Sequence, residues 1–153
     1  MPKFNTNRKV QHTDLEMFNL VSDVEQYPEF LPMCESLNVR SSEEKGNKTL
    51  LTADMTVGYK MIRETFTTQV LLDKEERRID VRYIDGPFRY LENRWIFKPL
   101  DDGKSCEVEF YIDYEFKSRM LGMLMGAMFD IAFKRFTEAF EMRADKIYGA
   151  QQA

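Results

Sequence analysis

The chain has 153 residues, of which 43% are hydrophobic and 31% are charged, so it can form one domain with a sizeable core. Its formal net charge of −4 differs from the basic surfaces of nucleic-acid-binding proteins, so we expect no nucleic-acid partner. No apolar run reaches the roughly 18 residues of a membrane-spanning helix, and the N-terminus lacks the apolar segment of a signal peptide. We therefore expect one cytoplasmic domain over residues 1–153, with its core at about 3–149.

The N-terminal part of the chain predicts a strand followed by two short helices. Residues Phe4–Gln11 read as a strand, and Thr13–Glu16 has the pattern of a capping box, which starts a helix. A second helix of about one turn is expected at Tyr27–Pro32. There Pro28 suits the first helical position, and Pro32 ends the helix because it lacks an N–H group.

A block of strands follows without an intervening helix. Turn signals occur at Glu43–Asn47, Asp85–Pro87 and Asp101–Gly103. The last strand, Cys106–Phe116, alternates most regularly between apolar and charged residues, which is typical of an antiparallel sheet covered on one side. The strands predicted between the helices are Leu37–Ser41, Thr49–Val57, Ile62–Leu72, Ile79–Tyr83, Leu91–Phe97 and Cys106–Phe116.

A long helix is predicted at the C-terminus, from an N-cap at Ser118 to a C-cap at Gly149. Its first part, Met120–Phe129, reads MLGMLMGAMF and has no polar side chain and four methionines. Methionine is flexible and suits surfaces that adapt to irregular apolar shapes. Since a sheet covers only one side of such a helix, a ligand, a protein partner or a membrane must cover the rest.

The order of these elements predicts an α+β fold. We expect a curved antiparallel sheet of about seven strands wrapped around the long C-terminal helix, with two short helices after the first strand. Between the sheet and the long helix there is room for either a solid core or a cavity.

Four local sequences carry a resemblance to a known family. They are Leu20–Val24 running into Tyr27–Pro32, Asp85–Arg89 with Leu91 and Trp95–Phe97, Tyr114–Ser118, and Phe140–Ala144. With the order of elements, they resemble the coenzyme Q-binding, polyketide cyclase/dehydrase-like family of the START (helix-grip) superfamily. The resemblance implies a START-like helix-grip fold with a hydrophobic tunnel between the sheet and the C-terminal helix.

The same resemblance implies a function. The expected ligand is an isoprenoid lipid, above all ubiquinone, and the expected role is that of a carrier or chaperone in respiratory electron transport or quinone biosynthesis. A sister branch resembles the ribosome-association toxin and implies binding to the large ribosomal subunit instead. A third reading is an aromatic polyketide cyclase or dehydratase.

Given such a tunnel, we expect its lining to come from apolar residues of the second short helix, the strands and the long helix. Ordinary core packing is the alternative for the second short helix, for Trp95 and Phe110, and for the Met-rich stretch. The predicted lining residues are Tyr27, Phe30, Leu31, Met55, Phe66, Val81, Tyr83, Leu91, Trp95, Phe110, Tyr114, Leu121, Met125, Met128, Phe129 and Phe133.

Glu64 is the one acidic residue that strand alternation places on an apolar face, together with Phe66 and Val70. We expect Glu64 and Asn93 to be polar anchors for a quinone head group. The alternative is that Glu64 lies at a solvated rim or that a bulge shifts the strand register.

Signatures of catalysis are few. His12 is the only histidine, no His/Cys cluster has metal-ligand spacing, and Cys34 and Cys106 read as reduced structural thiols. We therefore expect no catalytic residue, no metal and no required cofactor in a non-enzymatic protein. A cyclase would need an acid or base, for which Glu64 is the candidate. Through Met120–Phe129 we expect a transient contact with a membrane surface, which would make the protein peripheral at the inner membrane.

Overall fold

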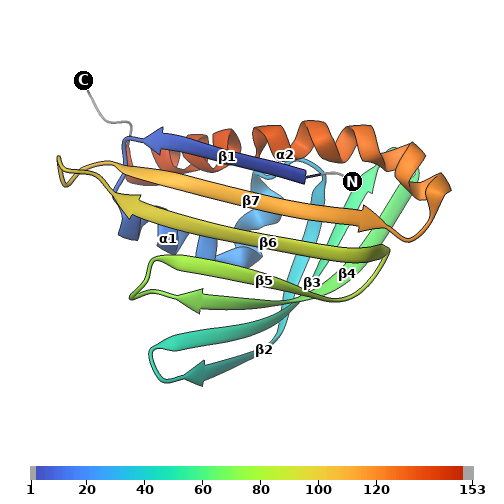
Figure 1. Ribbon diagram of the computed structural model, residues 1–153, viewed down its shortest axis with the longest axis horizontal. Coiled ribbons are helices and arrows are strands. Elements are labelled where there is room, and N and C mark those ends of the chain that lie inside the picture. Colours follow the sequence, from blue (N-terminus) through green and yellow to red (C-terminus); the bar gives the residue numbers. More distant parts are fainter. Residues whose placement is uncertain (1–2, 150–153) are drawn as a thin grey trace.

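The computed structural model describes residues 3–149, and its centre is one seven-stranded antiparallel sheet in the order β1-β7-β6-β5-β4-β3-β2 (Figure 1). Residues 1–2 and 150–153 of the expected domain lie outside the described residues. The elements are β1 (Lys3–Val10), α1 (Asp14–Ser22), the 3₁₀ helix η1 (Val24–Glu29), β2 (Cys34–Lys45), β3 (Lys48–Tyr59), β4 (Ile62–Asp73), β5 (Arg78–Asp85), β6 (Phe88–Pro99), β7 (Cys106–Phe116) and α2 (Arg119–Tyr148).

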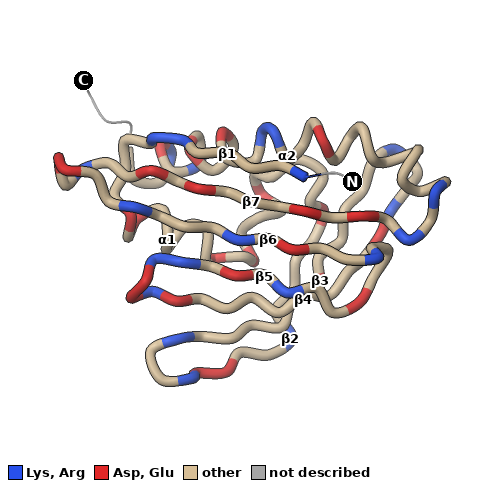
Figure 2. The backbone as a smooth tube through the Cα atoms, viewed as in Figure 1, with Lys and Arg blue, Asp and Glu red and all other residues tan. Residues whose placement is uncertain are grey.

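The architecture confirms the predicted helix-grip fold. Helices α1 and η1 carry the chain from the edge strand β1 to the opposite edge strand β2, and α2 packs along the curved sheet (Figure 1). Charged residues recur along β5, β6 and β7, whereas α2 carries none between its first residue, Arg119, and Asp130 (Figure 2). None of the helices within residues 3–149 has an apolar stretch long enough to cross a bilayer.

The predicted helix caps are confirmed. Glu16 donates its backbone N–H to the Thr13 hydroxyl at 3.0 Å, and Thr13 donates its N–H to the Glu16 carboxylate at 2.9 Å. At α2, the Ser118 hydroxyl accepts from the Leu121 N–H at 3.2 Å, and Gly149 follows the last residue with φ +87°.

The second short helix differs from its prediction. It spans Val24–Glu29, so Pro28 lies near its end, and Phe30 and Leu31 follow it. The helix begins early because the buried Val24 anchors its first turn in the core. It ends at Glu29, where Phe30 caps it by donating its N–H to the Tyr27 carbonyl at 3.1 Å.

The first hairpin is longer than predicted. Strand β2 continues past Ser41 to Lys45 and stays paired with β3, and the chain turns at Gly46, whose φ is +66°. The far end of β2 is exposed on both faces, so it carries no apolar alternation from which a strand could have been predicted.

A cluster of aromatic rings joins α2 to the sheet at one end. Phe88, at the start of β6, is fully buried and lies 4.9 to 6.0 Å, between ring centroids, from five other rings. These five rings belong to Phe66, Tyr83, Tyr114, Phe116 and Phe129. We call the six residues the Phe88 cluster. It connects β4, β5, β6, β7 and α2, and therefore sets where α2 begins to cross the sheet.

Gly86 makes this cluster possible. Its φ is +147°, and a Cβ at this position would lie 2.4 Å from the Cβ of Phe66. We expect Gly86→Ala to lower the free energy of unfolding by about 2 to 4 kcal/mol, from backbone strain plus overpacking. Urea unfolding followed by circular dichroism measures this loss.

Gly46→Ala is the matched control. Gly46 also has a positive φ, but a Cβ there would meet nothing within 4 Å, so only the backbone cost of about 1 kcal/mol remains. Equal losses in the two variants would show that the contact with Phe66 does not constrain the fold.

Candidate functional site

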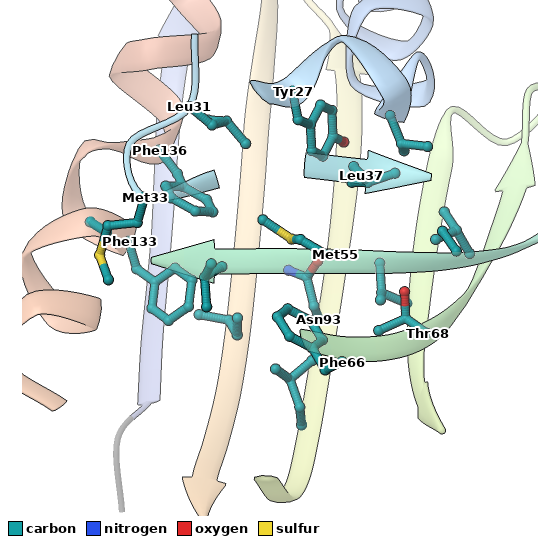
Figure 3. A pocket seen from close by; sticks show the side chains of 18 of the residues that line it. Tyr27, Leu31, Met33, Leu37, Met55, Phe66, Thr68, Asn93, Phe133 and Phe136 are labelled. Carbon is teal, nitrogen blue, oxygen red and sulfur yellow. The ribbon is translucent and has the colours of Figure 1, made fainter. Parts of the chain in front are cut away.

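An apolar cavity of about 110 Å³ lies between the concave face of the sheet and α2 (Figure 3). Of the described residues, 25 line it, from η1, the segment after η1, strands β2 to β7, and α2. None of these residues is charged. The cavity is the space that the inward side chains of the sheet and of α2 leave unfilled.

The lining residues follow the two periods of regular structure. On β3 they are Ala53, Met55 and Val57, which alternate as residues on one face of a strand do. On α2 they recur every three or four residues, as on one face of a helix. These helical positions are Phe129, Ala132, Phe133, Phe136 and Phe140.

Four of the described lining side chains carry an oxygen or nitrogen atom: those of Tyr27, Thr68, Asn93 and Trp95. Tyr27 donates its hydroxyl to the Val21 carbonyl at 2.5 Å, and burial raises the pKa of Tyr27 well above its usual value. Asn93 donates Nδ2 to the Tyr111 carbonyl at 2.8 Å, which leaves its Oδ1 as a free acceptor. Thr68 contributes a hydroxyl. Figure 3 places Thr68 and Asn93 on neighbouring parts of the sheet wall.

The cavity approaches the surface between the segment after η1 and the middle of α2. Pro32 lines both the cavity and an adjoining surface depression, which is also lined by Arg135 and Met142 of α2. The Met33 carbonyl accepts from the Gly58 N–H at 2.9 Å, which fastens this segment to the end of β3. We call the gap between Pro32 and α2 the mouth of the cavity.

Most of the predicted tunnel residues lie in the cavity wall. Figure 3 shows how side chains from the segment after η1, the strands and α2 converge on it. Their part in ligand binding stays a prediction. The predicted residues that line the cavity are Tyr27, Leu31, Met55, Phe66, Val81, Leu91, Asn93, Trp95, Phe110, Phe129 and Phe133.

Three predicted aromatic residues lie outside the wall. Tyr83 and Tyr114 belong to the Phe88 cluster, which fills the space beyond the end of the cavity. Phe30 packs edge-to-face on Phe140 at 5.1 Å from outside, with the Arg143 guanidinium 5.2 Å from its ring centroid. All three residues support the wall through residues that line it.

The prediction for the start of α2 needs a larger correction. Leu121, Met125 and Met128 do not line the cavity. The Phe88 cluster fills the space between the first turns of α2 and the sheet, so the cavity begins only at Phe129. Met125 is therefore core, with no exposed surface.

Glu64 is not part of the cavity wall. Strand alternation places it on the same face as Phe66 and opposite Val57, as predicted. However, it is half-exposed and lies two residues nearer the β3–β4 turn, beyond the ring of Phe66. This matches the alternative of a solvated rim position, and Asn93 is the predicted anchor that does face the cavity.

Sequence reasoning missed other lining residues. Most of them continue the strand or helix repeat of a residue that was predicted. Thr68 and Val70 follow Phe66 on the same face of β4, and Phe136 and Phe140 follow Phe133 on the same face of α2. The segment after η1 had no periodic signal. The missed residues are Val24, Pro32, Met33, Leu37, Ala53, Val57, Thr68, Val70, Ile79, Phe88, Ile112, Ala132, Phe136 and Phe140.

The single histidine and the cysteines lie outside the cavity wall. His12 is buried, and its Nε2 lies 2.6 Å from Asp145 Oδ1, which links the end of β1 to the last turns of α2. Cys34 and Cys106 are free thiols, and burial raises the pKa of each to about 12. Within residues 3–149, no group of three or more His, Cys, Asp or Glu side chains is arranged to hold a metal ion.

Comparison with known proteins gives a consistent family. A family model described as "Polyketide cyclase / dehydrase and lipid transport" matches residues 10–141. The ribosome association toxin RatA of Escherichia coli strain K12 is 32% identical over 151 residues, which cover 99% of this chain and 92% of that protein. The mitochondrial coenzyme Q-binding protein COQ10 homolog B of Xenopus laevis is 31% identical over 142 residues. That match covers 90% of this chain and 55% of the Xenopus protein.

A solved structure is similar over its whole length. The solution structure of an 18 kDa protein from Caulobacter crescentus has 35% sequence identity and a TM-score of 0.79, over 98% of this chain and 100% of that one. The seven-stranded sheet with its long C-terminal helix is therefore shared with an experimentally determined structure.

The buried hydroxyl of Tyr114 has no hydrogen-bond partner within residues 3–149. We expect Tyr114→Phe to leave the free energy of unfolding at neutral pH unchanged or to raise it by about 1 kcal/mol, since it removes an unsatisfied polar group. Tyr27→Phe is the matched control, which should lose about 1 kcal/mol with the bond to Val21.

At alkaline pH the stabilities of the wild type and of Tyr114→Phe should differ further. Burial raises the pKa of Tyr114 to about 12 in the folded protein, whereas the pKa of a tyrosine in the unfolded chain is about 10. The wild type therefore loses stability as pH rises from about 10 to about 12, and Tyr114→Phe loses less. Urea unfolding at neutral and alkaline pH measures the difference. A clear loss of unfolding free energy in Tyr114→Phe at neutral pH would contradict the statement that the Tyr114 hydroxyl has no hydrogen-bond partner.

Proposed function

The chain belongs to the polyketide cyclase/dehydrase and lipid transport family, and from this membership and its cavity we propose that it is a non-enzymatic carrier of an isoprenoid quinone, above all ubiquinone. The observation that carries the proposal is the composition of the cavity wall, which has 25 residues and no charge. Such a wall binds by burial of apolar surface, at about 25 cal/mol per Å². The Xenopus relative is named as a coenzyme Q-binding protein, which supports the choice of ligand.

The size of the cavity decides which part of the ligand enters. A volume of about 110 Å³ is smaller than the roughly 150 Å³ of an engineered apolar cavity that binds benzene. This volume leaves no room for an isoprenoid tail, and a substituted quinone ring fits only if flexible wall side chains such as Met33 and Met55 move aside. We therefore propose that the ring enters the cavity as these side chains move, and that the tail leaves through the mouth beside Pro32. The Thr68 hydroxyl and the Trp95 indole N–H are donors in the wall for a quinone carbonyl, and Asn93 Oδ1 is an acceptor for the hydroxyl of a quinol.

The same wall supports a carrier over a cyclase or dehydratase. Those reactions need an acid or base beside the substrate. Tyr27 is the one titratable residue among the described lining residues, and its hydroxyl is already bonded to the Val21 carbonyl. Glu64, the acid considered from the sequence, lies beyond the end of the cavity.

The first test is the ligand itself. Organic extraction and native mass spectrometry of the purified protein should recover a quinone, and a short-chain ubiquinone analogue should bind the protein after it is stripped of lipid. The absence of both co-purified quinone and binding of added quinone would refute the proposal.

A cavity-filling variant locates the binding site. Ala132 lines the cavity, so Ala132→Phe should weaken binding of the short-chain analogue at least about tenfold by occupying the space for the ring. Ala127→Phe is the matched control, because Ala127 lies on the outer, exposed side of the same helix. Equal affinities of the two variants would place the quinone outside this cavity.

The second candidate function is binding to the large ribosomal subunit. Its support is the match to the ribosome association toxin RatA, which extends over 92% of that protein. This function predicts co-sedimentation with large ribosomal subunits in sucrose gradients and growth arrest on overexpression. Since ribosome contact would use the protein surface, Ala132→Phe should leave co-sedimentation unchanged. The absence of both effects in the wild type would remove this candidate.

A further inference from the structure

The first turns of α2 expose a stripe of large apolar side chains. Met120, Met123 and Leu124 are 70%, 84% and 54% exposed, and Ala127 continues the same side of the helix. The opposite side carries Met125, which is fully buried. Helix α2 is therefore apolar on both sides here, and only one side is covered by the protein.

Another exposed apolar residue, from a different element, lies at the same end of the molecule. Met61, in the turn between β3 and β4, is 94% exposed. Figure 1 shows this turn and the start of α2 at the same end, and Figure 3 shows from another side that β3 points toward α2. The Phe88 cluster bridges the two elements, with Phe66 of β4 and Phe129 of α2 both packed on Phe88.

Cations without carboxylate partners border these apolar residues. Lys60 precedes Met61, and Lys117 and Arg119 precede Met120. None of these three cations takes part in an ion pair within residues 3–149, where an ion pair means a nitrogen–oxygen distance of at most 4.0 Å.

Other cations near this end are neutralised. Arg63 pairs with Glu35 at 2.8 Å, and Arg89 pairs with Glu115 at 3.2 Å. Between Glu115 and Asp130 the chain has two cations and no acidic residue (Figure 2). Although the protein is acidic as a whole, this segment carries unbalanced positive charge beside an apolar surface.

We propose that Lys60, Met61 and the segment Lys117–Ala127, together called the docking tip, bind the surface of an anionic lipid bilayer. Apolar side chains of an amphipathic helix enter the boundary between head groups and acyl chains, while neighbouring cations contact anionic head groups. The docking tip presents both kinds of group together.

The charge pattern favours a bilayer over the other occupants. A symmetric contact between two copies through this stripe would put Lys117 and Arg119 of both copies at the interface, with no acidic residue of the segment to balance them. A nucleic-acid surface would match the cations, but it would leave four exposed apolar side chains without apolar partners. An anionic bilayer satisfies both sets of groups.

The position of the docking tip also suits a lipid carrier. Leu124 in the tip and Ala132 in the cavity wall are eight positions apart on one continuous helix, or about 12 Å along its axis. A bilayer held at the tip would therefore lie close to the cavity.

Vesicle flotation tests the proposal without any quinone, so its outcome is independent of what the cavity binds. The wild type should float with vesicles of phosphatidylcholine and phosphatidylglycerol and much less with phosphatidylcholine alone. Met123→Glu should lower the vesicle partition coefficient at least about tenfold, because it removes apolar insertion and adds a repelled charge. Ile147→Glu is the matched control and should bind as the wild type does, since Ile147 is 50% exposed in the last turn of α2.

A charge variant tests the second half of the proposal. Lys117→Gln with Arg119→Gln should weaken binding to the anionic vesicles about 25-fold, or about fivefold for each cation lost. Lys104→Gln with Lys146→Gln removes the same charge elsewhere and should have little effect. Circular dichroism should show all four variants folded, because every substituted side chain is exposed.

Three results would overturn the proposal. The first is that wild type and Met123→Glu float equally well, or that Met123→Glu and Ile147→Glu lose the same amount of vesicle binding. The second is a dimer in analytical ultracentrifugation that Met123→Glu dissociates, which would assign the stripe to a second copy. The third is that the charge variant binds vesicles as well as the wild type does but no longer co-sediments with ribosomal subunits.

Discussion

One helix cannot fill the concave face of a seven-stranded sheet, and most features of this protein follow from that constraint. With neighbouring strands about 4.8 Å apart, seven strands extend over about 29 Å, whereas a helix with its side chains is about 10 to 12 Å wide. Helices α1 and η1 cover part of the remaining face with buried residues such as Leu20, Val21 and Val24. Because the inward positions on the strands are mostly apolar, the space still left over is a cavity with an uncharged, largely apolar wall.

The Phe88 cluster decides where that space lies. Its rings fill the gap between the sheet and the first turns of α2, so the cavity is displaced toward Phe133 and Phe140. The cluster depends on Gly86, since any side chain there would collide with Phe66. One end of the helix is thereby sealed against the sheet, and its outer side remains uncovered. The cavity and the docking tip are consequences of the same packing.

Local patterns predicted the elements well because each depends on neighbours in sequence. The alternation of β7, the capping box at Thr13 and the cap at Ser118 are such patterns. The cavity wall depends on contacts between distant residues, and there the prediction was weaker. Since Met120–Phe129 is apolar all round, its period gives no inward direction, and the closeness of Phe88 to α2 has no local signal. For Glu64, alternation gave the correct face of β4 but not its position beyond the end of the cavity.

The size of the cavity connects the two proposals. A cavity of about 110 Å³ must widen even to enclose the ring, so a long isoprenoid tail stays outside the protein. Each exposed methylene group of that tail costs about 0.8 kcal/mol in water, so a bare tail would oppose release from the bilayer far more strongly than the cavity favours it. A carrier of this design therefore works best while its helix remains on the membrane and its ligand's tail remains among the acyl chains. Under these conditions the protein moves the reactive ring along a membrane surface, which requires a docking surface and a cavity on the same helix.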